Sequence, residues 1–390
     1  MVKISWCDKI AQIPKAEWDT LAQPLKTPFL EWEWLNNLET SGSVTARNGW
    51  QPCHLIIRRS LKLIAAAPLY LKGHSYGEFV FDHQWADLSY RLGREYYPKM
   101  LGMTPFTPAE GYRFLISPEE NEREITKIMV KEIDNFCSRN QISSCNFLFV
   151  DPDWKEIMLD WGYSPWLHHS YIWSNKNFGT FDDYLKIFNT NQRRNIKRER
   201  KAVGKSGLEL AVLTGKDIPQ HLFPLIYRFY SSTCDKFYWG SKYLTRQFFT
   251  QLYPNYQQRV MLVVAYEEGK DIKSPVGMSF FLRKGHRLYG RYWGCLEEYN
   301  CLHFEACYYK PIEFSIKENI QIFDPGAGGS HKRRRGFPAT GNYSLHRFYD
   351  SRMSQILRTY IGKINEAEQE EIDAINNDLP FSKAKIELPL

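Results

Sequence analysis

Short apolar segments of strand length alternate with longer amphipathic segments along most of the chain. Leu208–Thr214 and Val260–Tyr266 have the length and composition of strands, whereas Glu119–Asn140 and Thr180–Lys205 have the periodicity of helices. Thr180 precedes Asp182 and Asp183, so we expect it to cap the N-terminus of its helix. This alternation predicts an α/β or α+β fold in which each half of the chain has a mixed central sheet flanked by helices. No apolar segment approaches the roughly 20 residues that cross a bilayer, so we expect no membrane span.

An internal repeat organises this pattern. Residues 61–74 resemble residues 273–286, because each segment is an apolar strand that ends in Lys-Gly-His. The same offset of 212 positions relates Tyr96-Tyr97 to Tyr308-Tyr309 without a gap. Each copy is therefore predicted to contain two strands, a tight Lys-Gly-His turn whose glycine has a positive φ, a third strand, and a helix that carries the paired tyrosines.

The repeat also predicts two domains. A chain of 390 residues is long enough for two hydrophobic cores. We expect a first domain over residues 1–175 and a second over residues 176–390. Reactive side chains that occur in only one copy indicate where chemistry takes place, and they occur in the second copy. The second domain is therefore the predicted catalytic half, and the first is predicted to be degenerate.

The candidate catalytic residues are His303 and Glu305, at the start of the helix in the second copy. The repeat offset places Arg91 and Gly93 opposite them in the first copy. Either candidate can accept a proton from a substrate amine if its pKa is suitably tuned. The structural alternative is that His303 caps the helix and Glu305 complements the helix dipole.

A glycine-rich segment leads directly into five consecutive basic residues, His331 to Arg335. Exposed backbone N–H groups and clustered cations suit phosphate or an RNA backbone, although the GxxxxGK[ST] pattern of a P-loop is missing. A flexible surface loop is the alternative. From this segment, the residues expected to bind donor or substrate are His331, Lys332 and Arg335.

Three large side chains alternate along the strand before the candidate helix. Tyr289, Arg291 and Trp293 lie two positions apart, which places them on one face of a strand. They are further candidates for binding donor or substrate, in a channel lined by rings and an arginine. Cross-strand packing is the alternative explanation.

A second basic block, Arg193 to Lys201, lies within the predicted helix 180–205. Contact with RNA or phosphate is the functional interpretation, and a solvated helix face is the ordinary one. The candidate RNA contacts are Arg193, Arg194, Lys197 and Arg198. The formal net charge of +7 permits an anionic ligand but does not require one.

The eight cysteines are scattered without CxxC spacing, and no set of histidines completes a zinc pattern. This usage is typical of a reduced, intracellular protein, and the N-terminal segment lacks an apolar core of signal length. We therefore expect a soluble cytoplasmic protein with no metal site, no tightly bound cofactor and no catalytic cysteine.

Several motifs, in collinear order, resemble a family of FemAB-like predicted N-acyltransferases. The motifs are Gly77–Asp82, Tyr97–Lys99, Pro105–Pro108, Arg193–Arg200, Trp239-Gly240, Tyr243–Arg246, Leu288–Cys295, Leu302–Tyr309 and Gly328–Gly336. The family is grouped with the GNAT superfamily, so the resemblance implies two tandem GNAT-like domains. It also implies transfer of an acyl group from acyl-CoA, or an aminoacyl group from aminoacyl-tRNA, to an amine. Ser330 stands where the family usually has glutamate, so no catalytic role is carried over to that position.

Together these features predict an acyl- or aminoacyltransferase that forms an amide by direct attack of a substrate amine. Glu305 or His303 would accept the amine proton, while Arg291, Lys332 and Arg335 would hold donor phosphates. The acceptor would be an amine-bearing small molecule or peptide, tRNA would be a further partner, and DNA would not. The alternatives are a non-catalytic RNA- or tRNA-binding protein and an acyl-CoA-dependent small-molecule N-acetyltransferase.

Overall fold

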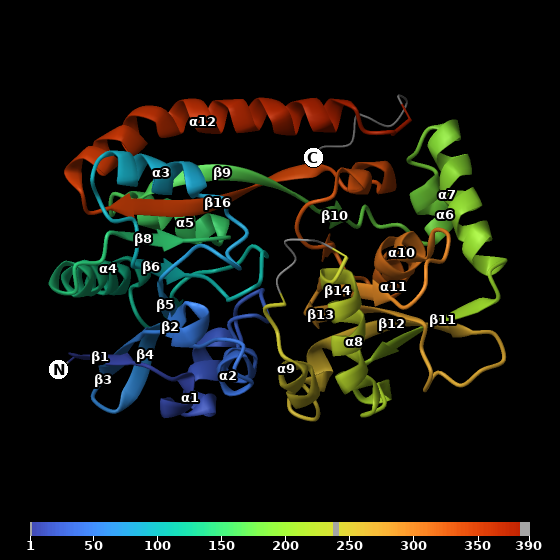
Figure 1. Cartoon of the computed structure of the whole chain (residues 1–390), viewed down its shortest axis with the longest axis horizontal. Coiled ribbons are helices and arrows are strands. Elements are labelled where there is room, and N and C mark those ends of the chain that lie inside the picture. The colour runs from blue at the N-terminus through green and yellow to red at the C-terminus, as the bar shows by residue number, and fades with distance from the viewer. Residues whose placement is uncertain (1, 237–241, 383–390) are drawn as a thin grey trace. The chain divides into compact units, whose positions relative to one another are not determined.

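The computed structural model describes residues 2–236 and 242–382, which divide into two compact units (Figure 1). Unit 1 consists of Met1–His169 and Gly341–Glu370, and unit 2 of Ser170–Thr340 and Glu371–Leu390. The chain enters unit 2 close to the expected boundary at residue 175. It then returns to unit 1 for residues 341–370, so a single division into 1–175 and 176–390 does not describe the two units.

Unit 1 contains a four-stranded and a six-stranded sheet. Its elements are β1 Val2–Cys7, α1 Lys15–Ala22, α2 Trp32–Thr40, β2 Trp50–Pro52, β3 His54–Arg59, β4 Lys62–Ala67, β5 Leu69–Lys72, α3 His83–Arg91, β6 Lys99–Gly102, β7 Leu115–Ile116, α4 Glu122–Arg139, β8 Ser144–Phe147, α5 Pro152–Leu159, β9 Ser164–Tyr171, β16 Ala339–Phe348 and α12 Ser351–Asn377, the last three of which extend into unit 2. The strand orders are β1-β3-β4-β7 and β2-β5-β6-β8-β16-β9. Helices α3 and α12 contribute Trp85, Met353 and Leu357 to one buried apolar cluster.

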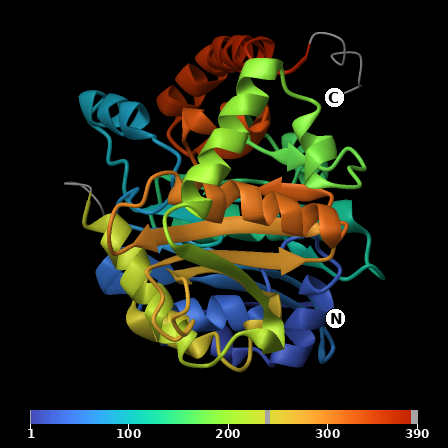
Figure 2. The same cartoon turned by 90° about the vertical axis from the view of Figure 1, so that its right-hand side faces the viewer.

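Unit 2 contains one six-stranded sheet, ordered β10-β15-β14-β13-β12-β11. Its elements are β10 Trp173–Ser174, α6 Phe181–Leu185, α7 Thr190–Gly204, β11 Leu208–Thr214, α8 Leu222–Cys234, α9 Arg246–Gln251, β12 Val260–Glu267, β13 Gly277–Lys284, β14 Arg287–Cys295, α10 Leu302–Phe304, the π-helical segment η5 Glu305–Tyr309, α11 Lys310–Lys317, β15 Ile322–Asp324 and the 3₁₀ segment η6 Ser330–Arg335. Figure 2 shows α11 (orange) and α8 (yellow-green) on opposite sides of these strands. Gly294 of β14 permits the close approach of α8, since a Cβ there would lie 1.9 Å from the carbonyl oxygen of Phe229.

The two units repeat one strand topology. In unit 1, β6 and β8 pair in parallel and are connected through α4, and in unit 2, β14 and β15 pair in parallel and are connected through α10, η5 and α11. Each parallel pair is extended by an antiparallel neighbour, β16 or β10. Pro68 separates β4 from β5, whereas the corresponding β13 is continuous. The predicted α/β fold with two tandem mixed sheets flanked by helices is confirmed.

The predicted Lys-Gly-His turn is confirmed only in unit 2. There, Gly285 has a φ of 53° and the chain passes directly from β13 to β14. In unit 1, residues 75–98, which we call the insertion, lie between Lys-Gly-His and β6 and include α3. Tyr96-Tyr97 therefore precede the third strand in an irregular segment, whereas Tyr308-Tyr309 follow it in η5.

The gapless match between these tyrosine pairs is accordingly wrong as a structural equivalence. The placement of Arg91 and Gly93 opposite His303 and Glu305 fails with it, because the residues belong to different parts of the repeat. The unit 1 element that corresponds to the helix of His303 and Glu305 is α4, the connection within the parallel strand pair.

The predicted helix 180–205 is divided into α6 and α7. Thr180 caps α6 as expected, since its hydroxyl accepts a hydrogen bond from the backbone N–H of Asp183 at 3.1 Å. Asn189 caps α7 in the same way through the N–H of Gln192. Trp239 and Gly240, which formed part of the family resemblance, lie outside the described residues. Within the described residues, no helix is long and apolar enough to cross a membrane.

Candidate functional site

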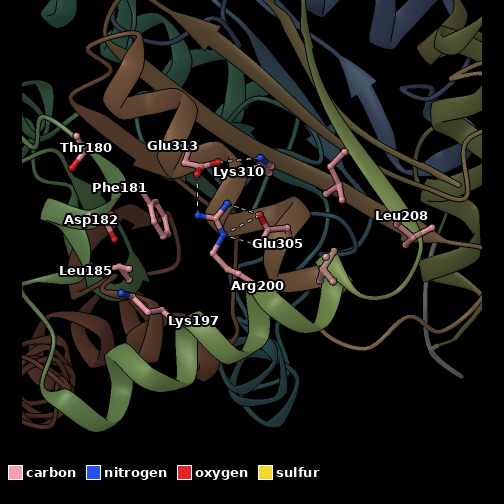
Figure 3. A pocket seen from close by; sticks show the side chains of 13 residues that line it. Thr180, Phe181, Asp182, Leu185, Lys197, Arg200, Leu208, Glu305, Lys310 and Glu313 are labelled. Atoms are coloured by element: carbon pink, nitrogen blue, oxygen red, sulfur yellow. Dashed lines mark hydrogen bonds and ion pairs between the residues drawn. The ribbon is translucent and has the colours of Figure 1, made fainter. Parts of the chain in front are cut away.

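A pocket of about 590 Å³ lies in unit 2, in the size range of small-molecule sites (Figure 3). It is bounded by α6, α7, β11, η5 and α11. Its lining residues are Thr180, Phe181, Asp182, Leu185, Lys197, Arg200, Val203, Gly204, Leu208, Leu210, Glu305, Lys310 and Glu313.

A charged network forms the base of the pocket. Arg200 of α7 donates to both carboxylate oxygens of Glu305, from Nη2 to Oε1 at 2.9 Å and from Nε to Oε2 at 3.1 Å. Its Nη1 donates to Glu313 Oε1 at 2.9 Å, and Lys310 lies 3.2 Å from the other Glu313 oxygen. One guanidinium thus joins two carboxylates that lie about two turns apart on one helical segment.

The two carboxylates differ in the direction of their pKa shifts. Desolvation raises the pKa of Glu305 above its usual range, although the hydrogen bonds and charge of Arg200 oppose the shift. Desolvation acts on Glu313 too, but Arg200 and Lys310 outweigh it and lower the pKa of that carboxyl. Glu305, which is 4% exposed, is therefore the better proton acceptor of the two.

Local sequence explains why these side chains meet. On α7, Ile196 and Val203 are buried and hold one face of the helix inward, which carries Arg200 toward η5. Glu305 begins η5, a π-helical segment of the kind that recurs at functional sites. Sequence reasoning identified Glu305 but missed Arg200 and Glu313, although Arg200 lies within the basic block that it singled out.

Apolar side chains form another part of the wall. Leu185, Val203 and Leu208 line it, and the Phe181 ring lies 4.3 Å from the Arg200 guanidinium carbon. Two exposed residues of opposite charge, Asp182 and Lys197, complete the lining. The pocket therefore combines an apolar surface with separate positive and negative groups.

The other predicted catalytic residue, His303, belongs to an aromatic cluster. Its ring centroid lies 5.7 Å from Trp293, 5.5 Å from Tyr308 and 5.6 Å from His331. His331 Nε2 and the Tyr308 hydroxyl are joined by a hydrogen bond of 2.8 Å. Burial and nearby cations lower the pKa of His303 and of His331 to about 4, so both imidazoles are neutral at pH 7. His303 does not line the pocket.

The basic segment 331–335 is largely turned inward. The ammonium of Lys332 donates to the carbonyls of Gly326 and Ala327 at 2.5 and 3.2 Å, and burial lowers its pKa to about 8. Arg335 Nη2 donates to both carboxylate oxygens of Glu199, at 2.9 and 2.8 Å. Both side chains are buried and bound internally, so the structure does not present them as a surface site for donor phosphates.

Glu199 is a further residue that sequence reasoning missed. It is the one acid within the basic block Arg193 to Lys201, and it also accepts a hydrogen bond from the Tyr309 hydroxyl. Its position as the single acid in a run of bases could have identified it from the sequence, because such an acid indicates a basic partner elsewhere in the chain. That partner is Arg335.

The three candidates on β14 have separate surroundings. Tyr289 is buried, whereas Arg291 and Trp293 are half-buried. Burial raises the pKa of Asp324, and the charge of Arg291 opposes that shift, which indicates that the two groups are close. Trp293 faces His303 instead. None of the three is among the pocket-lining residues.

The outer face of α7 carries a basic stripe, defined here as Arg194, Lys197, Arg198, Lys201 and Lys205. All five are exposed, and their spacing of three or four residues places them along one side of the helix. The stripe retains three of the four candidate RNA contacts, while Arg193 is half-buried. Lys197 belongs to both the stripe and the pocket lining.

Comparison with known proteins identifies the relatives of this fold. A FemAB-like family model, described as peptidoglycan biosynthesis/recognition, matches residues 9–383, which confirms the resemblance. A search of curated proteins found no match.

Three solved structures have a similar fold at low sequence identity. FemX is 10% identical, with a TM-score of 0.52 over 88% of this chain and 98% of its own. L-PGS from Bacillus licheniformis is 11% identical, with a TM-score of 0.50 over 88% and 97%. The C-terminal domain of a putative lysylphosphatidylglycerol synthetase from Agrobacterium fabrum is 8% identical, with a TM-score of 0.51 over 90% and 96%.

Proposed function

Because the chain belongs to the FemAB-like family, we propose that it is a transferase that moves an activated acyl or aminoacyl group onto an amine. The observation that carries this proposal is the position of Glu305. This carboxylate is buried, has a raised pKa and lines a pocket large enough for a small acceptor. A protonated amine has no lone pair for attack until it loses a proton, and Glu305 is placed to remove that proton.

The transfer then needs no covalent intermediate on the protein. The acceptor enters as an ammonium ion and gives one proton to Glu305, and its nitrogen attacks the donor carbonyl carbon. A new C–N bond forms as the C–O bond of an ester, or the C–S bond of a thioester, breaks. The second nitrogen proton passes to the leaving oxygen or sulfur, and Glu305 releases the first to solvent. Glu305 Oε1 accepts hydrogen bonds from both Nε and Nη2 of Arg200, whereas Oε2 accepts one from Nε and keeps a lone pair for the proton.

We infer that the donor is aminoacyl-tRNA rather than acyl-CoA. The basic stripe on α7 supports this choice, because five exposed cations on one helix face suit a phosphate backbone. Lys197 links the stripe to the pocket, so a bound RNA could present its charged end there. The name of the lysylphosphatidylglycerol synthetase, a protein of similar fold, is consistent with aminoacyl transfer.

The decisive test is donor consumption by the purified chain. The protein is incubated with a pool of aminoacyl-tRNAs or with acyl-CoAs and a mixture of amines, and loss of the ester or thioester is followed. Glu305→Gln should slow transfer about a hundredfold or more, because a general base typically contributes that much. Glu318→Gln, an exposed change at the end of the same helical segment, is the control and should have no effect. Full activity in the Glu305 variant would remove this residue from the mechanism.

The stripe also supports a second candidate function, an RNA-binding protein without catalysis. That protein would bind charged and uncharged tRNA equally, with an affinity that falls steeply with salt, and would leave the ester intact. Consumption of acyl-CoA alone would instead indicate a small-molecule N-acyltransferase.

A further inference from the structure

The charges that line the pocket balance. Its acidic residues are Asp182, Glu305 and Glu313, and its basic residues are Lys197, Arg200 and Lys310. A site for a polyanion needs a surplus of cations, and a site for a polyamine needs a surplus of carboxylates. Equal numbers of both signs beside an apolar wall match neither of these ligands.

The six charges fall into an internal group and an open pair. Arg200, Glu305, Glu313 and Lys310 bind one another at the base. Asp182 and Lys197 are exposed, and among the described residues neither has an ion-pair partner within 4.0 Å. Figure 3 shows this pair with Leu185 on one side of Arg200 and Glu305, and Leu208 on the other. At the base, Oε2 of Glu305 keeps a lone pair that can accept a hydrogen bond from an ammonium, and at the rim the Lys197 ammonium can pair with an anion.

We infer that the pocket binds a small zwitterion, and that the acceptor of the proposed transfer is a free amino acid. The α-ammonium would lie against Glu305 and Glu313, where the reacting nitrogen is needed. The α-carboxylate would pair with Lys197 at the rim, and the side chain would contact the apolar wall at Leu208, on the other side of Glu305. This assignment rests on the proposed function only in naming the ligand an acceptor, since binding itself requires no donor.

The assignment makes the carboxylate the recognised group. An amine that lacks it leaves Lys197 without its partner, and a carboxylate that lacks an ammonium leaves Oε2 of Glu305 without a donor from the ligand. An aminoacyl ester also has no free carboxylate, so the aminoacyl end of a donor would not satisfy Lys197. Dependence on the carboxylate therefore separates an acceptor site from a donor site.

Binding is measured by isothermal titration calorimetry on the full chain without donor. The probes are L-leucine, L-lysine and L-phenylalanine, each beside its decarboxylated counterpart, namely 3-methylbutylamine, cadaverine and 2-phenylethylamine. At least one amino acid should bind about tenfold more tightly than its counterpart, which corresponds to about 1.4 kcal/mol for one partly exposed ion pair. Lys197→Gln should remove this preference, and Lys201→Gln, an exposed change on the same helix outside the pocket, should preserve it.

Two results would overturn the inference. One is that no amino acid binds more tightly than its decarboxylated counterpart, and the other is that L-leucine methyl ester binds as tightly as L-leucine. Donor consumption with other amines in either case would leave the proposed function intact. Conversely, carboxylate-dependent binding without consumption of any donor would keep the zwitterion site and refute the transferase.

Discussion

Units 1 and 2 reach the end of the same strand pair with the same three residues and then differ. In unit 1, Lys72 of β5 is paired in register with Lys99 of β6, and in unit 2, Lys284 of β13 is paired with Arg287 of β14. Both units thus place two cations side by side across neighbouring strands, which costs stability unless anions compensate. Unit 2 joins the strands by a tight turn, whereas unit 1 uses the insertion, residues 75–98.

The insertion supplies the compensating anions in unit 1. Lys99 Nζ donates to Glu78 at 2.7 Å, to Asp82 at 2.5 Å and to the Ser75 hydroxyl at 2.7 Å. The Lys72 ammonium lies 3.6 Å from the centroid of the Trp50 ring. Burial lowers the pKa of Lys72 and raises that of Glu78, each to about 7, and every charged member of the cluster is at most 2% exposed.

The comparison teaches how to interpret a buried ion network. The unit 1 cluster consists of Lys72, Glu78, Asp82 and Lys99 and is closed to solvent. Its charges therefore hold the insertion on the sheet. The Arg200 network of unit 2 has similar chemistry but borders a pocket, so a ligand can reach it. Accessibility, rather than burial or a shifted pKa, therefore distinguishes the candidate site from the structural cluster.

Breaking the unit 1 cluster should have the largest effect. Lys99→Met leaves Glu78 and Asp82 buried without their main cation, and we expect a loss of about 3–5 kcal/mol in the free energy of unfolding. Urea denaturation measures this value. Lys62→Met removes an exposed ion pair with Glu119 and should cost at most about 1 kcal/mol. Equal losses in the two variants would contradict the structural role of the cluster.

Breaking the unit 2 network should cost less stability, because the pocket lets water reach the abandoned carboxylates. We expect Arg200→Met to lower the free energy of unfolding by about 2 kcal/mol, half of the loss expected for a closed pair. Adding Glu305→Gln to this variant removes one uncompensated charge and should restore part of the loss. A double-mutant cycle on the two residues measures the coupling, and strictly additive losses would show that they do not interact.

The pH dependence of stability tests the buried state of His303 in unit 2. The pKa of His303 is lowered to about 4 by burial and nearby cations, so between pH 6.5 and 4 the unfolded chain binds a proton that the folded chain does not. Stability therefore falls as the pH falls through this window. His303→Phe keeps the ring packing but has no group to protonate. Between pH 7 and 4, its free energy of unfolding should therefore fall by about 2–3 kcal/mol less than that of the parent protein. Parallel pH profiles of the two proteins, measured by urea denaturation, would contradict the neutral, buried state of His303.

The smallest effect on stability should come from the basic stripe. Arg194, Arg198 and Lys201 are exposed, and replacing all three by Gln should change the free energy of unfolding by no more than about 0.5 kcal/mol. The same variant should bind tRNA with a shallower dependence on salt, since each lost phosphate contact reduces the slope by about one. Filter binding at several salt concentrations measures the slope, and an unchanged slope would exclude the stripe as an RNA contact.

The sequence was informative wherever structure depends on neighbouring residues. The apolar pattern predicted β11 at its observed bounds, and Thr180 was identified as a cap from the acidic residues that follow it. Glu305 was chosen because it begins the helix of the second copy and the repeat offset placed Gly93 opposite it, although the structure shows that this register is wrong. The repeat was correctly inferred from the strands that end in Lys-Gly-His.

Features that join distant residues were not predictable in this way. Arg200 and Glu305 are 105 positions apart, and Glu199 and Arg335 are 136 apart, so no spacing rule brings them together. The insertion was hidden because the tyrosine pairs happen to fall in the register of the repeat. Local patterns likewise give no sign that the late strand β16 pairs with β8 of the first sheet.

The position of β16 has a consequence for the order in which the protein is made. Unit 1 contains the first 169 residues, yet the place between β8 and the edge strand β9 of its larger sheet is filled by β16, which ends at residue 348. A ribosome that synthesises about 5–20 residues per second completes all strands of unit 2 before β16 is finished. The larger sheet of unit 1 can therefore be completed only after all strands of unit 2 have been synthesised. A nascent chain truncated near residue 175 would lack β16 and leave a gap between β8 and β9.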